Sequence, residues 1–134
     1  MAPFWFAATI KAENPAEVSK LLETKVCQGC DLSGANLIGV ELENGKMRLS
    51  NLSVANLSDA NLEGAYFTGA NLSGANLSGT NLQWANLVNA DLKGANFSNA
   101  DLSQASLRDA QIDNADFSGA IMTGAIMPDG TVHP

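Results

Sequence analysis

The chain has 134 residues and a formal net charge of −7, from fourteen acids against seven bases. That length suits one domain, and the scattered bases exclude the clustered Lys and Arg that a nucleic-acid-binding surface needs. No run of eighteen apolar residues occurs, which excludes membrane insertion through a spanning helix. Only 6% of residues are aromatic, and Ala, Asn, Leu, Ser and Gly dominate, so the core must be built by repetition.

Residues 1–12 hold a short apolar run from Pro3 to Ile10, followed by Ala12 and a polar segment. One interpretation is the remnant of a signal peptide that is cleaved after Ala12. Against it, no Lys or Arg precedes the run, and the bulky Ile10 stands at the −3 position. The alternative is an N-terminal extension, either disordered or packed, and both interpretations stay open.

Residues 13–29 are expected to form an N-terminal capping helix and a Cys-x-x-Cys segment. Asn14 suits the N-cap, Pro15 suits the first helical position, and Glu17 follows three residues after the cap. Three apolar residues then share one helical face: Val18, Leu21 and Leu22. We expect that face to close the first layer of the repeat region, because a solenoid must shield its terminal apolar layer.

A period of five runs from residue 30 to residue 127. Its twenty apolar centres keep their phase throughout: Leu32, Leu37, Leu42, Met47, Leu52, Leu57, Leu62, Phe67, Leu72, Leu77, Leu82, Leu87, Leu92, Phe97, Leu102, Leu107, Ile112, Phe117, Met122 and Met127. Two positions before each centre stands a small residue, Ala in fifteen units. The exceptions are Cys30, Val40, Gly45, Ser50 and Thr80. Asn or Asp lies between the two in most units.

Neither a helix nor one long strand accommodates this period. Five residues turn an α-helix by about 500°, so successive centres lie about 140° apart and form no stripe. In a continuous strand, odd steps send alternate centres to opposite faces. Short extended pieces fit, with the centre and the small residue inward, Asn or Asp outward, and two residues that bend the chain. We therefore predict an all-β solenoid whose coils stack about 4.8 Å apart.

The units "ANLSG", "ANLEG", "ADLKG" and "ADFSG" resemble the A-(N/D)-L-x-x consensus of the pentapeptide-repeat family, and the resemblance covers residues 30–127. It implies a right-handed quadrilateral β-helix with four pentads per turn. Twenty pentads then make about five coils, or about 24 Å of rod. Residues twenty apart should stack, which places Phe97 next to Phe117 and Met47 next to Phe67.

Cys27 and Cys30 lie between the expected helix and the repeats. Together with the distant His133 they do not supply the four ligands of a zinc site, and the surroundings of a thioredoxin-type motif are absent. A disulfide that pins the helix to the first coil is favoured if the protein is exported, and two reduced thiols are the alternative. The spacing also resembles that of cyanobacterial and thylakoid-lumen family members, in which a short helix and "C-x-G-C-D-L-S-G" precede the repeats. That resemblance implies an oxidising or variable compartment, the thylakoid lumen or the periplasm, with the cytoplasm as the alternative.

The stretch of residues 40–52 departs most from the repeat, and Lys46 and Arg48 flank its centre on the outside. A register of twenty places Lys46 one coil from Tyr66, where a cation–π contact can form. We therefore predict a contact with a partner at Lys46, Arg48 and Tyr66. A tolerated irregular coil is the alternative interpretation.

Trp84 is a further candidate partner contact, at a corner position stacked between Gly64 and Gln104. An exposed aromatic side chain can anchor a protein partner. A Trp84 side chain folded flat over Gly64 is the alternative.

Residues 128–134 are predicted to form a C-terminal tail. The repeat stops at Pro128 and a turn at Asp129–Gly130. Ile121 and Ile126 stand where an outward Asn is usual, and we expect them to cover the last coil or to meet a partner.

No set of residues resembles a catalytic site, because Asp91, Asp101 and Asp116 simply occupy the outward Asn/Asp position. We expect a non-enzymatic structural or protein-interaction rod without cofactor or metal, acting on an unknown protein partner as a monomer or weak end-to-end dimer. The alternative is a DNA mimic that modulates topoisomerase (gyrase), as certain family members do. Residues 31–127 carry ten acids and four bases, a net of −6. That is less than half of the roughly 14 charges that B-DNA presents over about 24 Å.

Overall fold

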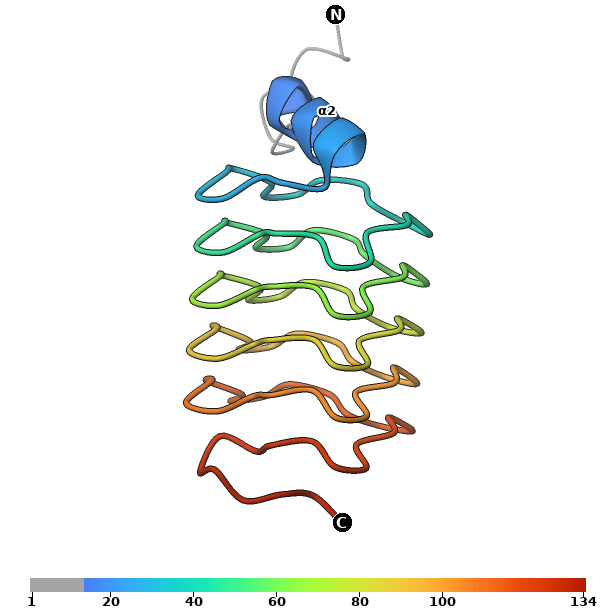
Figure 1. The fold of residues 1–134 in the computed structure, drawn as a ribbon, viewed down its shortest axis with the longest axis vertical. Helices are drawn as coiled ribbons and strands as arrows, with labels where there is room; N and C mark the ends of the chain where they lie inside the picture. Colours follow the sequence, from blue (N-terminus) through green and yellow to red (C-terminus); the bar gives the residue numbers. More distant parts are fainter. Residues whose placement is uncertain (1–13) are drawn as a thin grey trace, which may run out of the picture.

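The computed structural model describes residues 14–134, which form a solenoid of stacked coils with a helix at its N-terminal end (Figure 1). The helix, α2, spans Pro15–Thr24. Asn14 caps it, because its Oδ1 accepts a hydrogen bond from the backbone N–H of Glu17 at 3.3 Å. Lys25 ends the helix in the left-handed conformation. The helix therefore begins with the cap and first-turn residues that the sequence indicates.

α2 packs on the first coil through a narrow face. Val18 and Leu21 are buried in the same apolar cluster as the repeat centres. Leu22 is 50% exposed, because it lies about 100° around the helix from Leu21 and turns away from the coil. In the part of the chain that the structure describes, no helix is both long and apolar enough to span a bilayer. The interpretation of residues 1–12 lies outside the described residues.

Backbone bridges join residues twenty apart, so each coil contains four pentads. All bridges between successive coils are parallel, and they form four ladders, which we call walls 1 to 4. Wall 1 runs through Val26, Lys46, Tyr66, Asn86, Ser106 and Ile126; wall 2 through Asp31, Asn51, Asn71, Asp91 and Gln111; wall 3 through Asn36, Asn56, Asn76, Asn96 and Asp116; wall 4 through Glu41, Asn61, Asn81, Asp101 and Ile121. Pairing is confined to one bridge per pentad, because the two following residues bend the chain.

The core consists of the two inward residues of each pentad, as the period predicts. The centres from Leu32 to Leu107 are each 0% exposed. From Leu32 onward, each corner is closed by a backbone bond, for example from Ala35 N–H to the Leu32 carbonyl oxygen at 3.1 Å. Outward Asn and Asp side chains accept a bond from the backbone N–H two residues on, as Asn71 Oδ1 does from Ser73 at 2.9 Å. This local bond explains why Asn and Asp recur at that position.

The irregular stretch near the first coil has specific packing reasons. A Cβ atom at Gly45 would lie 2.9 Å from the Leu42 carbonyl oxygen and 3.1 Å from Met47 Cε, so the backbone turn at Leu42 and the long Met47 side chain together leave little room for the usual Ala. Ser50 is 1% exposed, and its hydroxyl donates to the carbonyl oxygen of Cys27 at 2.5 Å. Both departures from Ala therefore serve contacts inside the solenoid.

The rings of Phe97 and Phe117 stack with centroids 5.1 Å apart and planes 5° from parallel. This confirms the predicted stacking of residues twenty apart. The last coil is less enclosed than the others, since Phe117 and Ile112 are only partly buried.

The C-terminal tail folds back on the last coil. Ile126 pairs antiparallel with Val132, and the Gly130 N–H donates to the Met127 carbonyl oxygen at 2.8 Å. Gly130 has a φ of 86°, which suits the turn at that point. Ile121 is 53% exposed on wall 4, so it does not cover the last coil.

Candidate functional site

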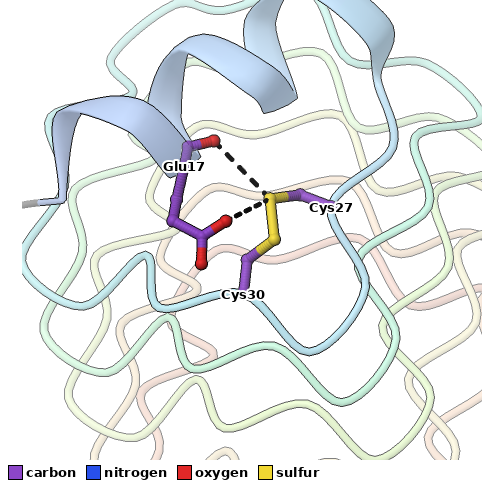
Figure 2. Close-up of side chains that lie close together, drawn as sticks. All are labelled: Glu17, Cys27 and Cys30. Atoms are coloured by element: carbon purple, nitrogen blue, oxygen red, sulfur yellow. Dashed lines mark hydrogen bonds between the residues drawn. A yellow bond between two sulfur atoms is a disulfide. The ribbon is translucent and has the colours of Figure 1, made fainter.

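Cys27 and Cys30 form a disulfide at the first corner of the solenoid, with Cα atoms 5.5 Å apart (Figure 2). Cys27 is a pentad centre on wall 1, and Cys30 is the small inward residue of the next pentad. Because α2 ends at Thr24, the bond closes a corner of one coil and does not cross-link the helix to that coil. The bond joins the end of the capping segment, residues 13–29, to the first inward residue of the repeats.

Glu17 of α2 lies against this disulfide (Figure 2). Its carbonyl oxygen is 3.5 Å and its carboxylate Oε2 is 3.7 Å from Cys27 Sγ. One ligand atom each from Glu17, Cys27 and Cys30 lie within 4.8 Å of one another, but sulfur binds metal as a thiolate, and here both sulfurs are in the disulfide. The contact between Glu17 and Cys27 could not be predicted from the sequence, because it depends on how α2 packs on the first coil and not on any spacing.

A shallow hollow of about 320 Å³ lies on wall 1, lined by Gln28, Lys46, Arg48 and Tyr66. Lys46 and Tyr66 are bridge partners in adjacent coils. Val26 and Lys46 are also bridge partners in adjacent coils. Gln28 and Arg48 each follow one of these residues by two positions, so they occupy the same outward position in adjacent coils. Three predicted contact residues are thus brought together. Gln28 was not predicted to join this group, although its position twenty residues before Arg48 places it there.

The two cations of the hollow have no counter-ion among the residues that the structure describes. Within residues 14–134, the salt bridges are Lys25 with Glu43 at 2.7 Å and Lys93 with Asp91 at 3.8 Å. Lys46 and Arg48 take part in neither, and no cation–π contact between Lys46 and Tyr66 is present among the described residues. Both cations are exposed, as is Tyr66, so this positive charge faces solvent.

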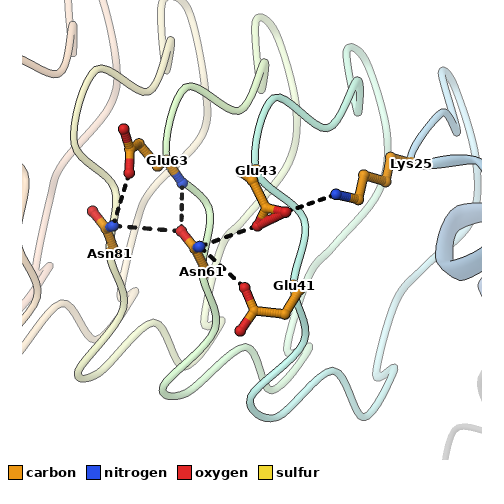
Figure 3. Close-up of polar contacts among 6 residues, drawn as sticks. All are labelled: Lys25, Glu41, Glu43, Asn61, Glu63 and Asn81. Atoms are coloured by element: carbon orange, nitrogen blue, oxygen red, sulfur yellow. Dashed lines mark hydrogen bonds and ion pairs between the residues drawn. The ribbon is translucent and has the colours of Figure 1, made fainter.

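Wall 4 carries the opposite charge, in a hydrogen-bonded ladder (Figure 3). Asn61 Nδ2 donates to Glu41 at 3.1 Å and to Glu43 at 3.0 Å, and Asn81 Nδ2 donates to Asn61 and Glu63, each at 3.4 Å. The hydrogen bond from Lys25, above all, holds the pKa of Glu43 below its ordinary value. Glu43, three residues before Lys46, is therefore already paired with Lys25.

Trp84 stands apart from the hollow. It is 64% exposed and adopts a φ of 62° at a corner of the solenoid. The side chain that lies over Gly64 is that of Asn44, and no Trp84 atom comes within 4 Å of the Cβ position of Gly64. The alternative in which Trp84 folds flat over Gly64 is therefore wrong, whereas its role as a partner contact stays a prediction.

The outward Asp residues make structural hydrogen bonds. Asp101 accepts from the Ser103 hydroxyl at 2.5 Å and from its backbone N–H at 3.0 Å. Asp116 accepts the same pair of bonds from Ser118, and the hydroxyl bond is the main cause of its lowered pKa.

Comparisons with known proteins agree with this geometry. Pentapeptide repeats, in eight copies, match residues 26–53, 55–94 and 85–124. Rfr23, a pentapeptide repeat protein from the cyanobacterium Cyanothece, is 26% identical with a TM-score of 0.69, over 80% of this chain and 93% of its own. A pentapeptide repeat protein from the Arabidopsis thaliana thylakoid lumen is 35% identical with a TM-score of 0.60, over 78% of this chain and 70% of its own.

The chain therefore belongs to the pentapeptide repeat family. QnrB1, a plasmid-mediated fluoroquinolone resistance protein, is 19% identical with a TM-score of 0.35, over 75% of this chain and 64% of its own. That likeness is too low to carry a functional argument. No curated protein sequence matches the chain.

Proposed function

We propose that this protein is a non-enzymatic interaction rod that contacts a protein partner through one wall of its solenoid. The supporting observation is the hollow on wall 1, where two cations and an exposed tyrosine lie on paired coils, and neither cation has a counter-ion within residues 14–134. Proteins with pentapeptide repeats typically act as structural or interaction proteins. Function then resides in the outward side chains, because the inward ones fill the core.

The proposal includes the finer architecture of the rod. About five coils (residues 30–127) wind as a right-handed quadrilateral β-helix, residues 13–29 cap the N-terminal end, and residues 128–134 form a tail. The burial of Val18 and Leu21 supports the capping role of α2. The rod acts as a monomer or a weak end-to-end dimer, and the partly buried Phe117 in the last coil supports the dimer.

We place the protein in the thylakoid lumen or the periplasm. A disulfide between Cys27 and Cys30 suits an oxidising compartment. A relative of 35% identity comes from a thylakoid lumen.

Site-specific photocrosslinking tests the proposed function. A photoreactive amino acid replaces Tyr66 on wall 1 or, as the matched control, Asn76 on wall 3, and the protein is illuminated in an extract of its native compartment. We expect a discrete protein adduct from position 66 that is absent from position 76. Adducts of equal yield from both positions, or from neither, would contradict an interaction rod that uses one wall.

The acidic ladder of wall 4 favours a second candidate, a DNA mimic that acts on gyrase. Its weakness is the charge, since Lys25 neutralises Glu43 and wall 1 presents cations. A gyrase supercoiling assay separates the two candidates. Strong inhibition by the wild-type rod that is lost in Glu41→Gln and Glu63→Gln variants would establish the mimic in place of the interaction rod.

A further inference from the structure

We propose that wall 1 docks an acidic segment of its protein partner, with a carboxylate held in the hollow between Lys46 and Arg48. This inference rests on the proposed function and names the chemistry of the partner. It follows from the way in which the twenty-residue register sorts charge among the walls.

Wall 1 is the cationic wall of the rod. Of the four cations in residues 30–127, Lys46, Arg48 and Arg108 lie on wall 1, and only Lys93 lies elsewhere, on wall 2. Neither the bridge residues of wall 1 nor the residues two positions after them include an acid. The neighbouring walls 2 and 4 carry most of the outward acids. In a chain of net charge −7, one wall therefore attracts anions.

The positive charge at the hollow is available to a partner. Lys46 and Arg48 take part in no ion pair among the described residues, whereas Lys25 and Lys93 are paired. Glu43, the acid that comes shortly before them in the chain, is held by Lys25 and Asn61. A carboxylate from outside therefore meets two cations that form no ion pair with any residue from 14 to 134.

Apolar and aromatic groups border the same cations. Tyr66 is 42% exposed, and Leu49, directly after Arg48, is 68% exposed. Tyrosine and arginine are also frequent centres of binding energy in protein interfaces. These side chains can cover the apolar part of a segment whose acid binds in the hollow.

The charge pattern favours a short acidic protein segment over a nucleic acid. The Arg48 guanidinium can bind a carboxylate through two parallel hydrogen bonds, and the Lys46 ammonium adds a point charge. A nucleic acid would extend its regular charges beyond the hollow, toward the acids of walls 2 and 4, where repulsion opposes binding. A segment with a few carboxylates avoids these walls.

The test is a titration of the ¹⁵N-labelled, oxidised full chain, followed by backbone amide NMR shifts. The probe is an octapeptide of alternating Glu and Ser, at low salt. We expect saturable shifts at the amides around Gln28, Lys46, Arg48 and Tyr66, and shifts that shrink as salt is added. An absence of shifts up to millimolar peptide, or shifts centred on wall 2, 3 or 4, would overturn the proposal.

Two charge reversals of equal size provide the matched control. Arg48→Glu is expected to raise the dissociation constant by about tenfold or more, whereas Lys93→Glu on wall 2 changes it by less than about twofold. Equal losses in both variants would show that net charge alone attracts the peptide and would overturn the site. An octanucleotide of thymidine that binds wall 1 more tightly than the peptide would also overturn it, in favour of a nucleic acid.

The photocrosslinking above separates this inference from the proposed function. A protein adduct at position 66, combined with no binding of the acidic peptide, leaves the interaction rod standing and removes the acidic partner. The opposite result is a lack of any protein adduct together with peptide-induced shifts confined to wall 1. It would contradict the proposed interaction rod and leave the carboxylate-binding site standing.

Discussion

The Ser50 hydroxyl donates to the carbonyl oxygen of Cys27 at 2.5 Å, from the second coil to the first. In later pentads the carbonyl oxygen of the centre accepts instead from the backbone three residues on, as Leu32 does from Ala35. Within residues 14–134 no such bond joins Cys30 N–H to Cys27. Ser50 therefore takes over the role of the corner bond at the position where the disulfide shapes the turn.

Ser50→Ala should destabilise the solenoid by about 1–3 kcal/mol, because the buried carbonyl group of Cys27 loses its donor. Urea denaturation followed by circular dichroism measures the loss. Ser53→Ala on wall 2 is the control and should change stability by less than about 0.5 kcal/mol. A Ser50 variant as stable as the Ser53 variant would show that the bond does not stabilise the fold.

Gly45→Ala should also destabilise the protein, although Ala is the usual residue at that position of the repeat. The added Cβ would lie 2.9 Å from the Leu42 carbonyl oxygen and 3.1 Å from Met47 Cε, and such overpacking costs about 1–3 kcal/mol. Thermal unfolding of Gly45→Ala and of the double variant Gly45→Ala/Met47→Leu checks this. The double variant should recover part of the loss, since the shorter side chain removes the Cε atom. A stabilising Gly45→Ala would refute the packing account.

Opening the disulfide should lower stability by about 2 kcal/mol, since the bond closes a loop of only four residues and short loops give small chain-entropy gains. Unfolding midpoints with and without a dithiol reductant measure this. The double variant Cys27→Ser/Cys30→Ser is the control, and the reductant should leave its midpoint unchanged. If the reductant shifts the two proteins equally, the disulfide is not the cause.

The Lys25–Glu43 ion pair should make stability depend on acid pH. The pKa of Glu43 is lowered in the folded protein, chiefly by the hydrogen bond from Lys25. The stabilisation is therefore fully present above the ordinary pKa of 4.5 and is lost as the pH falls through the lower, folded value. The melting temperature of Glu43→Gln should lie below that of the wild type at pH 7, and the gap should close in acid. A constant gap at all pH values would contradict the assignment.

Much of the fold could be predicted from the phase of the repeat together with the resemblance to the pentapeptide-repeat family, which implied four pentads per turn. Once the period of five is read with four pentads per turn, Phe97 must lie next to Phe117, and Leu72 must lie in the layer next to Leu92, as the bridge between Asn71 and Asp91 shows. Such positions follow from counting, because every coil repeats the geometry of the one before. How many residues of the helix would be buried was harder to predict. Leu22 was expected on the buried face, and it is exposed.

The candidate site was only partly accessible from sequence. Lys46, Arg48 and Tyr66 were recognised as neighbours by counting, and Gln28 was not, because it precedes the first complete repeat. The contact of Glu17 with Cys27 and the fit of Gly45 to Met47 arise from helix placement and side-chain length. Neither follows from a spacing.

Twenty residues per coil also determine how this chain tolerates insertions and deletions. Removing twenty residues between residues 50 and 90 would keep each wall aligned with itself. The rod would be one coil shorter, and every wall would keep its type of outward side chain. Removing a single pentad would instead turn everything downstream by a quarter revolution, and Arg108 would leave the side of Lys46 for an adjacent one. Removing one residue would turn the downstream Leu side chains outward and bring Asn and Ser into the two inward positions, so evolution can lengthen or trim this molecule cleanly only in steps of one full turn.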